Sequence, residues 1–239
     1  MTPTPFCLSR VPVLGFLTAG LLALLAPTGA QAQEAAEPDY RQIAQTIGNH
    51  KSPNYYPTLV SRYLANDTTL SLENYRNLYY GFALQEDFVP YQDEKAELLD
   101  IRREIAETGG SKDICPEAIR ISRAILDDNP FNLLAIATLS IASLQTGDTV
   151  SFLQWQQKQQ GLLDAILSSG DGDSPATAFH VISLEHEYEV LSRLGLEVES
   201  DSLCNGEIEY LRVKENASGE RGFYFNFGAC SRIYNVKYK

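Results

Sequence analysis

The pattern of apolar and polar residues predicts a chain that is helical over most of its length and extended only near its end. Between residues 40 and 107, apolar side chains recur every three or four positions, which is the spacing of one helix face. Four helices are expected in this part: one around residues 43–47, one from Pro53 or Asn54 to Asn66, one with Ser71 as its N-cap, and one over residues 94–107.

The middle of the chain has the clearest helical period. One apolar stripe contains Ile114, Ala118, Ile121 and Ile125. Residues 131–146 contain no charged side chain and have apolar residues on every face, so this segment is expected to be the buried central helix. Two further helices are expected, one over residues 150–167 and one over residues 175–194 that has Ser174 as its N-cap and Pro175 at its first position.

After Gly195 the pattern changes to a period of two, which is typical of strands. The segments expected to form strands are residues 207–213, residues 223–227 and residues 233–238. Because helices come first and strands last, the sequence predicts an α+β fold. We expect a single domain over residues 40–239, a helical body ending in a small antiparallel β-sheet, a hairpin or meander that starts at about residue 204.

One segment of the helical body resembles a tetratricopeptide repeat. The small residue Ala118 and the proline Pro130 match the second helix of such a unit, and Gly147 falls at the turn of the following unit. About one and a half units match this pattern. The resemblance implies helix pairs that pack closely through small residues.

A second resemblance extends from about residue 40 to residue 235. The motifs that carry it are Tyr55-Tyr56-Pro57, Arg62-Tyr63, Asp67-Thr68-Thr69-Leu70, Leu78-Tyr79-Tyr80-Gly81, Pro90-Tyr91, His186-Glu187-Tyr188 and Tyr224-Phe225-Asn226. In these motifs the chain is similar to an exported bacterial family, the domain of unknown function 4919. The resemblance implies a single unit and export, and the family has no assigned activity that could be transferred.

The N-terminal segment has the pattern of a secretory signal peptide. Arg10 precedes an apolar run over residues 11–26, and Ala30 and Ala32 occupy the positions required before a cleavage site. We therefore expect a signal peptide over residues 1–32 and a polar leader over 33–39. The mature protein would then be periplasmic or extracellular, without a membrane span, because the apolar run is shorter than the roughly 20 residues that cross a bilayer.

The charge of the chain restricts the expected partners. The formal net charge is −12, and removal of Arg10 with the signal peptide makes it −13. An acidic protein of this kind is repelled by nucleic acids and by anionic membranes. The expected partner is another envelope or secreted protein, and no cofactor is expected.

Three cysteines remain after signal cleavage, namely Cys115, Cys204 and Cys230. Because Cys204 and Cys230 flank a predicted hairpin in an oxidising compartment, they could form a disulfide bond. The alternative is that all three are small buried residues. Their spacing lacks the pairs of a zinc site, so no metal site is expected.

Aromatic residues are concentrated between Tyr55 and Tyr91. They could form a binding surface, because exposed aromatic rings give a large contact area, or they could pack in the core, which their helical spacing favours. As candidate binding residues we take Tyr55, Tyr56, Tyr80 and Tyr91, of which Tyr80 and Tyr91 are expected to be the most exposed.

The predicted C-terminal helix carries two histidines. His180 and His186 are six residues apart, whereas a zinc protease requires the H-E-x-x-H spacing. We therefore assign no catalytic residue and take His186, Glu187 and Tyr188 as weak binding candidates. Residues 171–173 resemble a calcium loop but lack the later ligands, so a surface loop is expected.

Two functions remain possible from the sequence. The first is a soluble, non-enzymatic protein-interaction or envelope-accessory module. The alternative is a glycan-binding protein or a hydrolase that uses the Tyr55–Tyr91 block and the His180–Glu189 helix. The alternative requires an open cleft in which His186, Glu187 or Glu189 meets tyrosines of the N-terminal helices.

Overall fold

The computed structural model describes residues 35–90, 96–108 and 114–237. The predicted signal peptide, the start of the leader and Tyr91 lie outside these residues. The helices are α1 (Tyr40–Gly48), α2 (Tyr56–Leu64), α3 (Leu72–Phe82), α4 (Ala96–Thr108), α5 (Cys115–Asp128), α6 (Leu133–Thr146), α7 (Thr149–Leu167), a short 3₁₀ helix η1 (Pro175–Thr177), α8 (Glu185–Arg193) and α9 (Gly228–Lys237). The strands are β1 (Phe179–His180), β2 (Val198–Leu203), β3 (Ile208–Val213) and β4 (Gly222–Asn226). The predicted α+β class is confirmed.

Several helices begin where a side chain satisfies the first backbone amides. Ser71 accepts a hydrogen bond from the amide of Asn74, whose side chain accepts one from the Ser71 amide, so α3 starts with the predicted N-cap. Asp148 accepts from the Ser151 amide at the start of α7. Gly147 ends α6 at φ +81°, a left-handed conformation that suits glycine.

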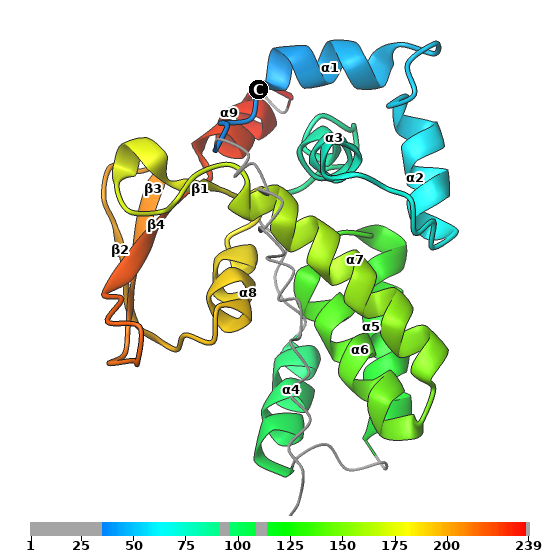
Figure 1. Ribbon diagram of the computed structural model, residues 1–239, viewed down its shortest axis with the longest axis vertical. Helices are drawn as coiled ribbons and strands as arrows, with labels where there is room; N and C mark the ends of the chain where they lie inside the picture. The colour runs from blue at the N-terminus through cyan, green and yellow to red at the C-terminus, as the bar shows by residue number, and fades with distance from the viewer. Residues whose placement is uncertain (1–34, 91–95, 109–113, 238–239) are drawn as a thin grey trace, which may run out of the picture. The chain divides into compact units, whose positions relative to one another are not determined.

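Helices α5, α6 and α7 pack in sequence order and form the centre of the helical body (Figure 1). Helix α6 is buried over most of its length, as its uncharged sequence predicts. Helix α3 packs on α7, and α1 and α2 pack on α3. None of the described helices is both long enough and apolar enough to cross a membrane. The resemblance to a tetratricopeptide repeat rests on sequence and stays a prediction.

The strands form one mixed sheet with the order β1-β4-β3-β2. Strands β2, β3 and β4 are antiparallel neighbours, and β1 pairs in parallel with β4. The sheet was expected to be antiparallel and to begin at about residue 204, and both details were wrong. Strand β1 begins at Phe179, and it pairs in parallel with β4. In Figure 1, α8 lies between this sheet and the pair α6–α7.

The predicted helix over residues 175–194 is also wrong in its first half. Residues 178–182 are all buried in succession, which is typical of a strand covered on both faces and not of a helix with one buried face. The His180 amide donates to the Ser169 hydroxyl, and the Val181 amide donates to the Asn226 carbonyl. His180 therefore lies in β1 and does not share a helix with His186.

Residues 233–237 of the last predicted strand belong to helix α9, and Tyr238 lies outside the described residues. The side chains that reach the core are Cys230 and Ile233, which are three residues apart, the spacing of a helix. Val236 is one of the apolar residues whose period of two predicted a strand, and its side chain is 82% exposed. Burial of one helix face therefore decided the structure of this segment.

Candidate functional site

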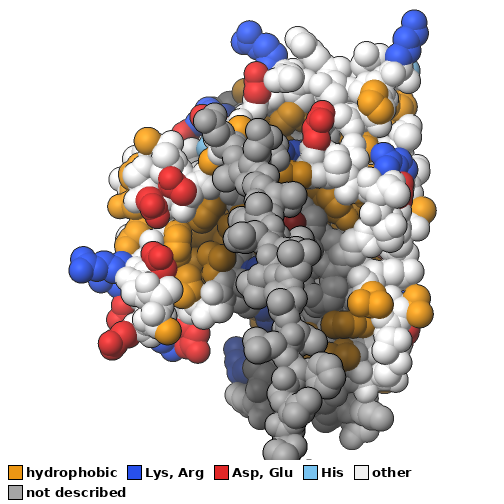
Figure 2. Space-filling model, in the orientation of Figure 1, with side chains coloured by type: hydrophobic (Ala, Val, Ile, Leu, Met, Phe, Trp, Pro, Cys, Tyr) orange, Lys and Arg blue, Asp and Glu red, His pale blue; other side chains and the backbone are white. Residues whose placement is uncertain are grey.

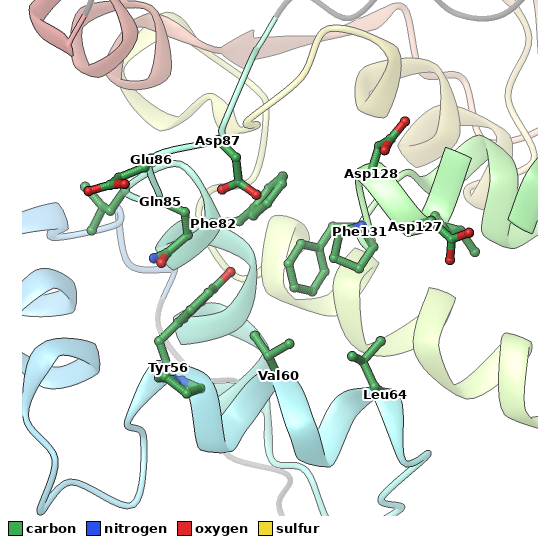
Figure 3. Close-up of a pocket in the computed structure, with 14 residues that line it drawn as sticks. Tyr56, Val60, Leu64, Phe82, Gln85, Glu86, Asp87, Asp127, Asp128 and Phe131 are labelled. Carbon is green, nitrogen blue, oxygen red and sulfur yellow. The ribbon is translucent and has the colours of Figure 1, made fainter. Parts of the chain in front are cut away.

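An open groove with a mostly apolar lining lies between α2, the end of α3 and the end of α5, and its volume is about 970 Å³. It is called the α2–α5 groove below. Its lining residues are Tyr56, Pro57, Val60, Leu64, Phe82, Leu84, Gln85, Glu86, Asp87, Leu126, Asp127, Asp128, Pro130 and Phe131. Figure 3 shows α2 along one side and the two phenylalanines between the groups of acidic residues.

Helix α2 supplies the apolar wall. Tyr56, Val60 and Leu64 are spaced four residues apart, so they lie on one face of the helix and point into the groove (Figure 3). Pro57 fits at the start of the helix, where its missing amide costs nothing. Leu64 is 56% exposed although it is apolar, so the groove offers a surface that water covers.

The back of the groove is a layer of packed aromatic rings. The rings of Phe82 and Phe131 are 5.1 Å apart, and Phe131 is 5.2 Å from the ring of Tyr63 behind it. The Tyr63 hydroxyl donates to the Pro130 carbonyl at 3.1 Å. The Phe131 amide donates to the side chain of Asn129, which turns the chain after α5. These contacts fix the wall before any ligand binds.

Four carboxylates stand around the groove. Glu86 and Asp87 follow α3, Asp127 and Asp128 end α5, and all four are exposed. The two groups lie at opposite ends of the groove in Figure 3. Helix α5 has no basic residue in its last turn. Acidic groups at a helix C-terminus oppose the helix dipole and cost about 0.3–1 kcal/mol each.

Tyr56 places its ring in the groove. Its hydroxyl donates to the Leu78 carbonyl at 3.4 Å, and Gly81 allows the ring to lie close to α3, where a Cβ atom would be 3.1 Å from Tyr56 Cε2. Burial, and then the charge of Asp87, raise the pKa of the Tyr56 hydroxyl well above its usual value. The side chain is therefore a neutral phenol at physiological pH and offers an apolar surface.

The other predicted aromatic residues have different places. Tyr55 is partly buried, and its ring lies 4.7 Å from that of His50. Tyr80 was expected to be exposed, and this is wrong: it is fully buried, and its hydroxyl bonds to the carbonyls of Ala165 and His180. Tyr91 lies outside the described residues. Of the three candidates that the structure describes, only Tyr56 lines the α2–α5 groove.

His186, Glu187 and Tyr188 all belong to α8 but face different surroundings. His186 Nδ1 lies 2.7 Å from the hydroxyl of Tyr79 in the core, and burial lowers its pKa to about 3. Glu187 is fully buried, and burial together with the charge of Glu209 raises its pKa to about 9. Tyr188 is 46% exposed.

These positions do not form the cleft that a hydrolase on this helix requires. His186 meets Tyr79 of α3, as that hypothesis demanded, but both side chains are enclosed by the core. Glu189 is buried on another side of α8, where it forms an ion pair with Arg102 of α4. His186, Glu187 and Glu189 are thus held in separate packing contacts.

The possible Cys204–Cys230 disulfide is absent from the structure. Cys204 is exposed near the β2–β3 turn, whereas Cys230 is buried and donates to the Val181 carbonyl. Burial raises the pKa of the Cys230 thiol to about 12. Cys115 is buried at the start of α5. Among the described residues, no group of three His, Cys, Asp or Glu side chains has a geometry that could hold a metal ion.

Most groove residues were missed from sequence because they come from three separate helices. Leu64 looked like an ordinary helix residue, and the pairs Glu86-Asp87 and Asp127-Asp128 looked like solvated turns. The available signal was that each acidic pair lies at or just after the end of an amphipathic helix and within three residues of a phenylalanine, Phe88 or Phe131. Only folding brings the two pairs to one groove.

Comparison with known proteins supports the family suggested by the sequence motifs. No curated protein and no solved structure matches the chain. The family described as a domain of unknown function (DUF4919) matches residues 41–237, which include all the described groove residues. This match covers most of the chain. The protein therefore belongs to the DUF4919 family.

Proposed function

We propose that this chain is an exported, non-enzymatic protein-interaction module, and that the α2–α5 groove binds an apolar segment of a partner protein. The observation that carries the proposal is the groove itself: an open, preformed trough with an apolar helix face on one side and packed aromatic rings behind it. Exposed apolar surface of this kind marks interaction sites in soluble proteins.

The size of the groove fits a short segment of a partner. A volume of about 970 Å³ lies at the upper end of the range for ligand pockets, and the groove is open, so it can hold the side chains of a longer chain. Each large apolar side chain that becomes buried contributes about 1.5–3 kcal/mol. The binding free energy from two or three such side chains is reduced by the entropy lost when the segment is ordered. The affinity that remains is typical of transient protein partners.

The chemistry of the lining also favours binding. None of the described lining residues is a His, Cys, Ser or Lys, and the carboxylates that could act as acids or bases are exposed and divided between the two ends of the groove. His186 and Glu187 of α8 are enclosed in the core, and Glu189 is paired with Arg102, so none of the three lies in this groove. The groove thus has contact area and charge, and these are the properties that recognition requires.

The proposal is tested by selecting peptides from a displayed random library and comparing two variants with the wild type. Leu64→Glu places a charge on the exposed wall of the groove. Leu153→Glu is the matched control, because Leu153 is similarly exposed, at 64%, but lies on α7 outside the groove lining. We expect the selected peptides to contain at least two large apolar residues and to bind Leu64→Glu at least tenfold more weakly than the control.

Two outcomes would refute the groove as a binding site. One is that no peptide is enriched on the wild-type protein. The other is that selected peptides bind wild type and both variants equally. The export part of the proposal is tested separately, by the intact mass of the protein recovered from its native host, which should correspond to cleavage after Ala32. Recovery of the uncleaved chain from the cytoplasm would contradict it.

A further inference from the structure

We propose that the segment bound in the α2–α5 groove is cationic, with an apolar centre flanked on both sides by lysine or arginine. This inference rests on the proposed function and specifies the partner of the same site. Its basis is the position of the acidic residues: Glu86 and Asp87 lie at one end of the apolar wall, and Asp127 and Asp128 lie at the other (Figure 3).

Three of these carboxylates, those of Asp87, Asp127 and Asp128, are available to a partner. Asp87, Asp127 and Asp128 are exposed, and none of the described basic residues forms an ion pair with them. Other exposed acids of the chain are already paired, as Glu117 is with Arg120 and Glu197 with Lys214. The groove therefore keeps a negative potential that a bound cation could neutralise.

The position of Asp127 and Asp128 is unfavourable for the helix that carries them. They are the last two residues of α5, where the helix dipole already concentrates negative charge and the carbonyls have lost their helical partners. Stability alone would favour lysine or arginine at these positions. The dipole and the two side chains instead reinforce one another and make this end of the groove attractive to a cation.

The length of the apolar wall limits the partner segment. From Tyr56 to Leu64 the wall extends for two helical turns, roughly 12 Å. A segment that covers it needs about four extended residues or about eight helical ones. Basic side chains placed just outside this length would reach the acidic ends, so we expect spacing as well as charge to matter.

The same charges exclude other occupants. A second copy of the mature chain would bring its own acidic groove ends and a net charge of −13 to the interface, so like charges would face each other. Figure 2 shows further acidic side chains over the strands, scattered among apolar and basic ones. Nucleic acids and anionic lipid surfaces are disfavoured for the same reason.

The test uses the full mature chain and three peptides that share the apolar centre obtained from the library selection. The flanks carry two lysines, two glutamines or two glutamates on each side, and binding is measured by fluorescence anisotropy. We expect the lysine peptide to bind most tightly and the glutamate peptide most weakly. The advantage of lysine over glutamine should decline when the salt concentration rises from about 50 mM to about 500 mM, because exposed charges are screened.

A double variant tests whether Asp127 and Asp128 are the carboxylates that attract the lysine flanks. Asp127→Asn with Asp128→Asn should weaken the lysine peptide about fivefold and leave the glutamine peptide unchanged. The control, Glu215→Gln with Glu220→Gln, makes the same change of net charge on the exposed β3–β4 connection and should have little effect. The melting temperature of the aspartate variant should equal or exceed that of the wild type, which shows that its fold is intact.

The outcomes separate this inference from the proposed function. If the three peptides bind the wild type equally, the groove remains a binding site and the cationic partner is refuted. If both double variants weaken the lysine peptide equally, the effect belongs to net charge and the assignment to α5 is refuted. If none of the three peptides binds, the proposed function itself fails.

Discussion

Replacing Glu187 by glutamine should remove a large part of the pH dependence of stability. Glu187 lies on α8, is fully buried, and faces the sheet carboxyl groups of Glu209 and Asp201. Burial is the largest cause that raises its pKa from 4.5 to about 9, and the neighbouring acids add to the shift. The folded protein therefore holds this proton at physiological pH, whereas the unfolded chain releases it.

The sign of the effect follows from this difference. Between pH 4.5 and about 9 the folded state binds more protons at Glu187 than the unfolded state does, so the contribution of this group to stability is fully present below pH 4.5 and is lost as the pH rises to about 9. The loss is about 1.4 kcal/mol per pH unit. From pH 6.5 to pH 8 the free energy of unfolding should therefore fall by about 2 kcal/mol through this group.

This pH range avoids two other buried groups. The pKa of His186 is lowered to about 3, so its contribution changes only below its ordinary value of 6.5. The pKa of Lys158 is lowered from 10.5 to about 8 by burial, so its contribution changes only above that pH. Glutamine has the shape of a protonated glutamate and no proton to release, which makes it the appropriate replacement.

The measurement is urea denaturation of the wild type, Glu187→Gln and the exposed control Glu215→Gln at pH 6.5 and pH 8. The wild type and the control should lose about 2 kcal/mol between the two pH values, and Glu187→Gln should lose markedly less. Equal losses in all three proteins would refute the conclusion that this carboxyl group is buried and neutral.

Three further changes test the packing around the site. Tyr79→Phe leaves a buried imidazole nitrogen and a backbone amide without their partner, so it should cost about 1–3 kcal/mol in urea denaturation; an unchanged midpoint would contradict the contact. Gly172→Ala should destabilise the protein more than Gly219→Ala does. Both glycines have a positive φ, but only the added Cβ at Gly172 meets an aromatic ring, that of Phe179, at 2.5 Å. Equal melting temperatures of the two variants would show that the ring can move aside. A thiol reagent should label Cys204 in the native protein and Cys230 only after unfolding; protection of both without reductant would indicate a disulfide.

The helical body could be predicted because its signals are local. Ser71 is identified as a cap by its own side chain, and the uncharged segment that became α6 has no polar face to expose. The family motifs gave the extent of the unit for the same reason, since they are short and contiguous. Such features depend on neighbours in sequence.

The sheet and the groove depended on distant contacts and were predicted poorly. His180 is extended because β4 pairs with it from 46 residues further on, and this partner cannot be recognised in the residues around His180. Tyr80 was expected at the surface, but α7 and β1 supply carbonyl partners for its hydroxyl, which is why a polar aromatic residue can be buried there. The groove combines side chains of α2, α3 and α5, and no local pattern marks residues that meet only after folding.

Nuclear magnetic resonance of the full mature chain tests the central claim most directly. Backbone and methyl signals are recorded while the selected apolar peptide with lysine flanks is added. The account predicts that the signals that shift most belong to the groove, at Val60, Leu64, Leu84 and Leu126, and that shifts are small on α8 and the sheet. Shifts concentrated around Tyr188 on α8, or none at saturating peptide, would contradict it.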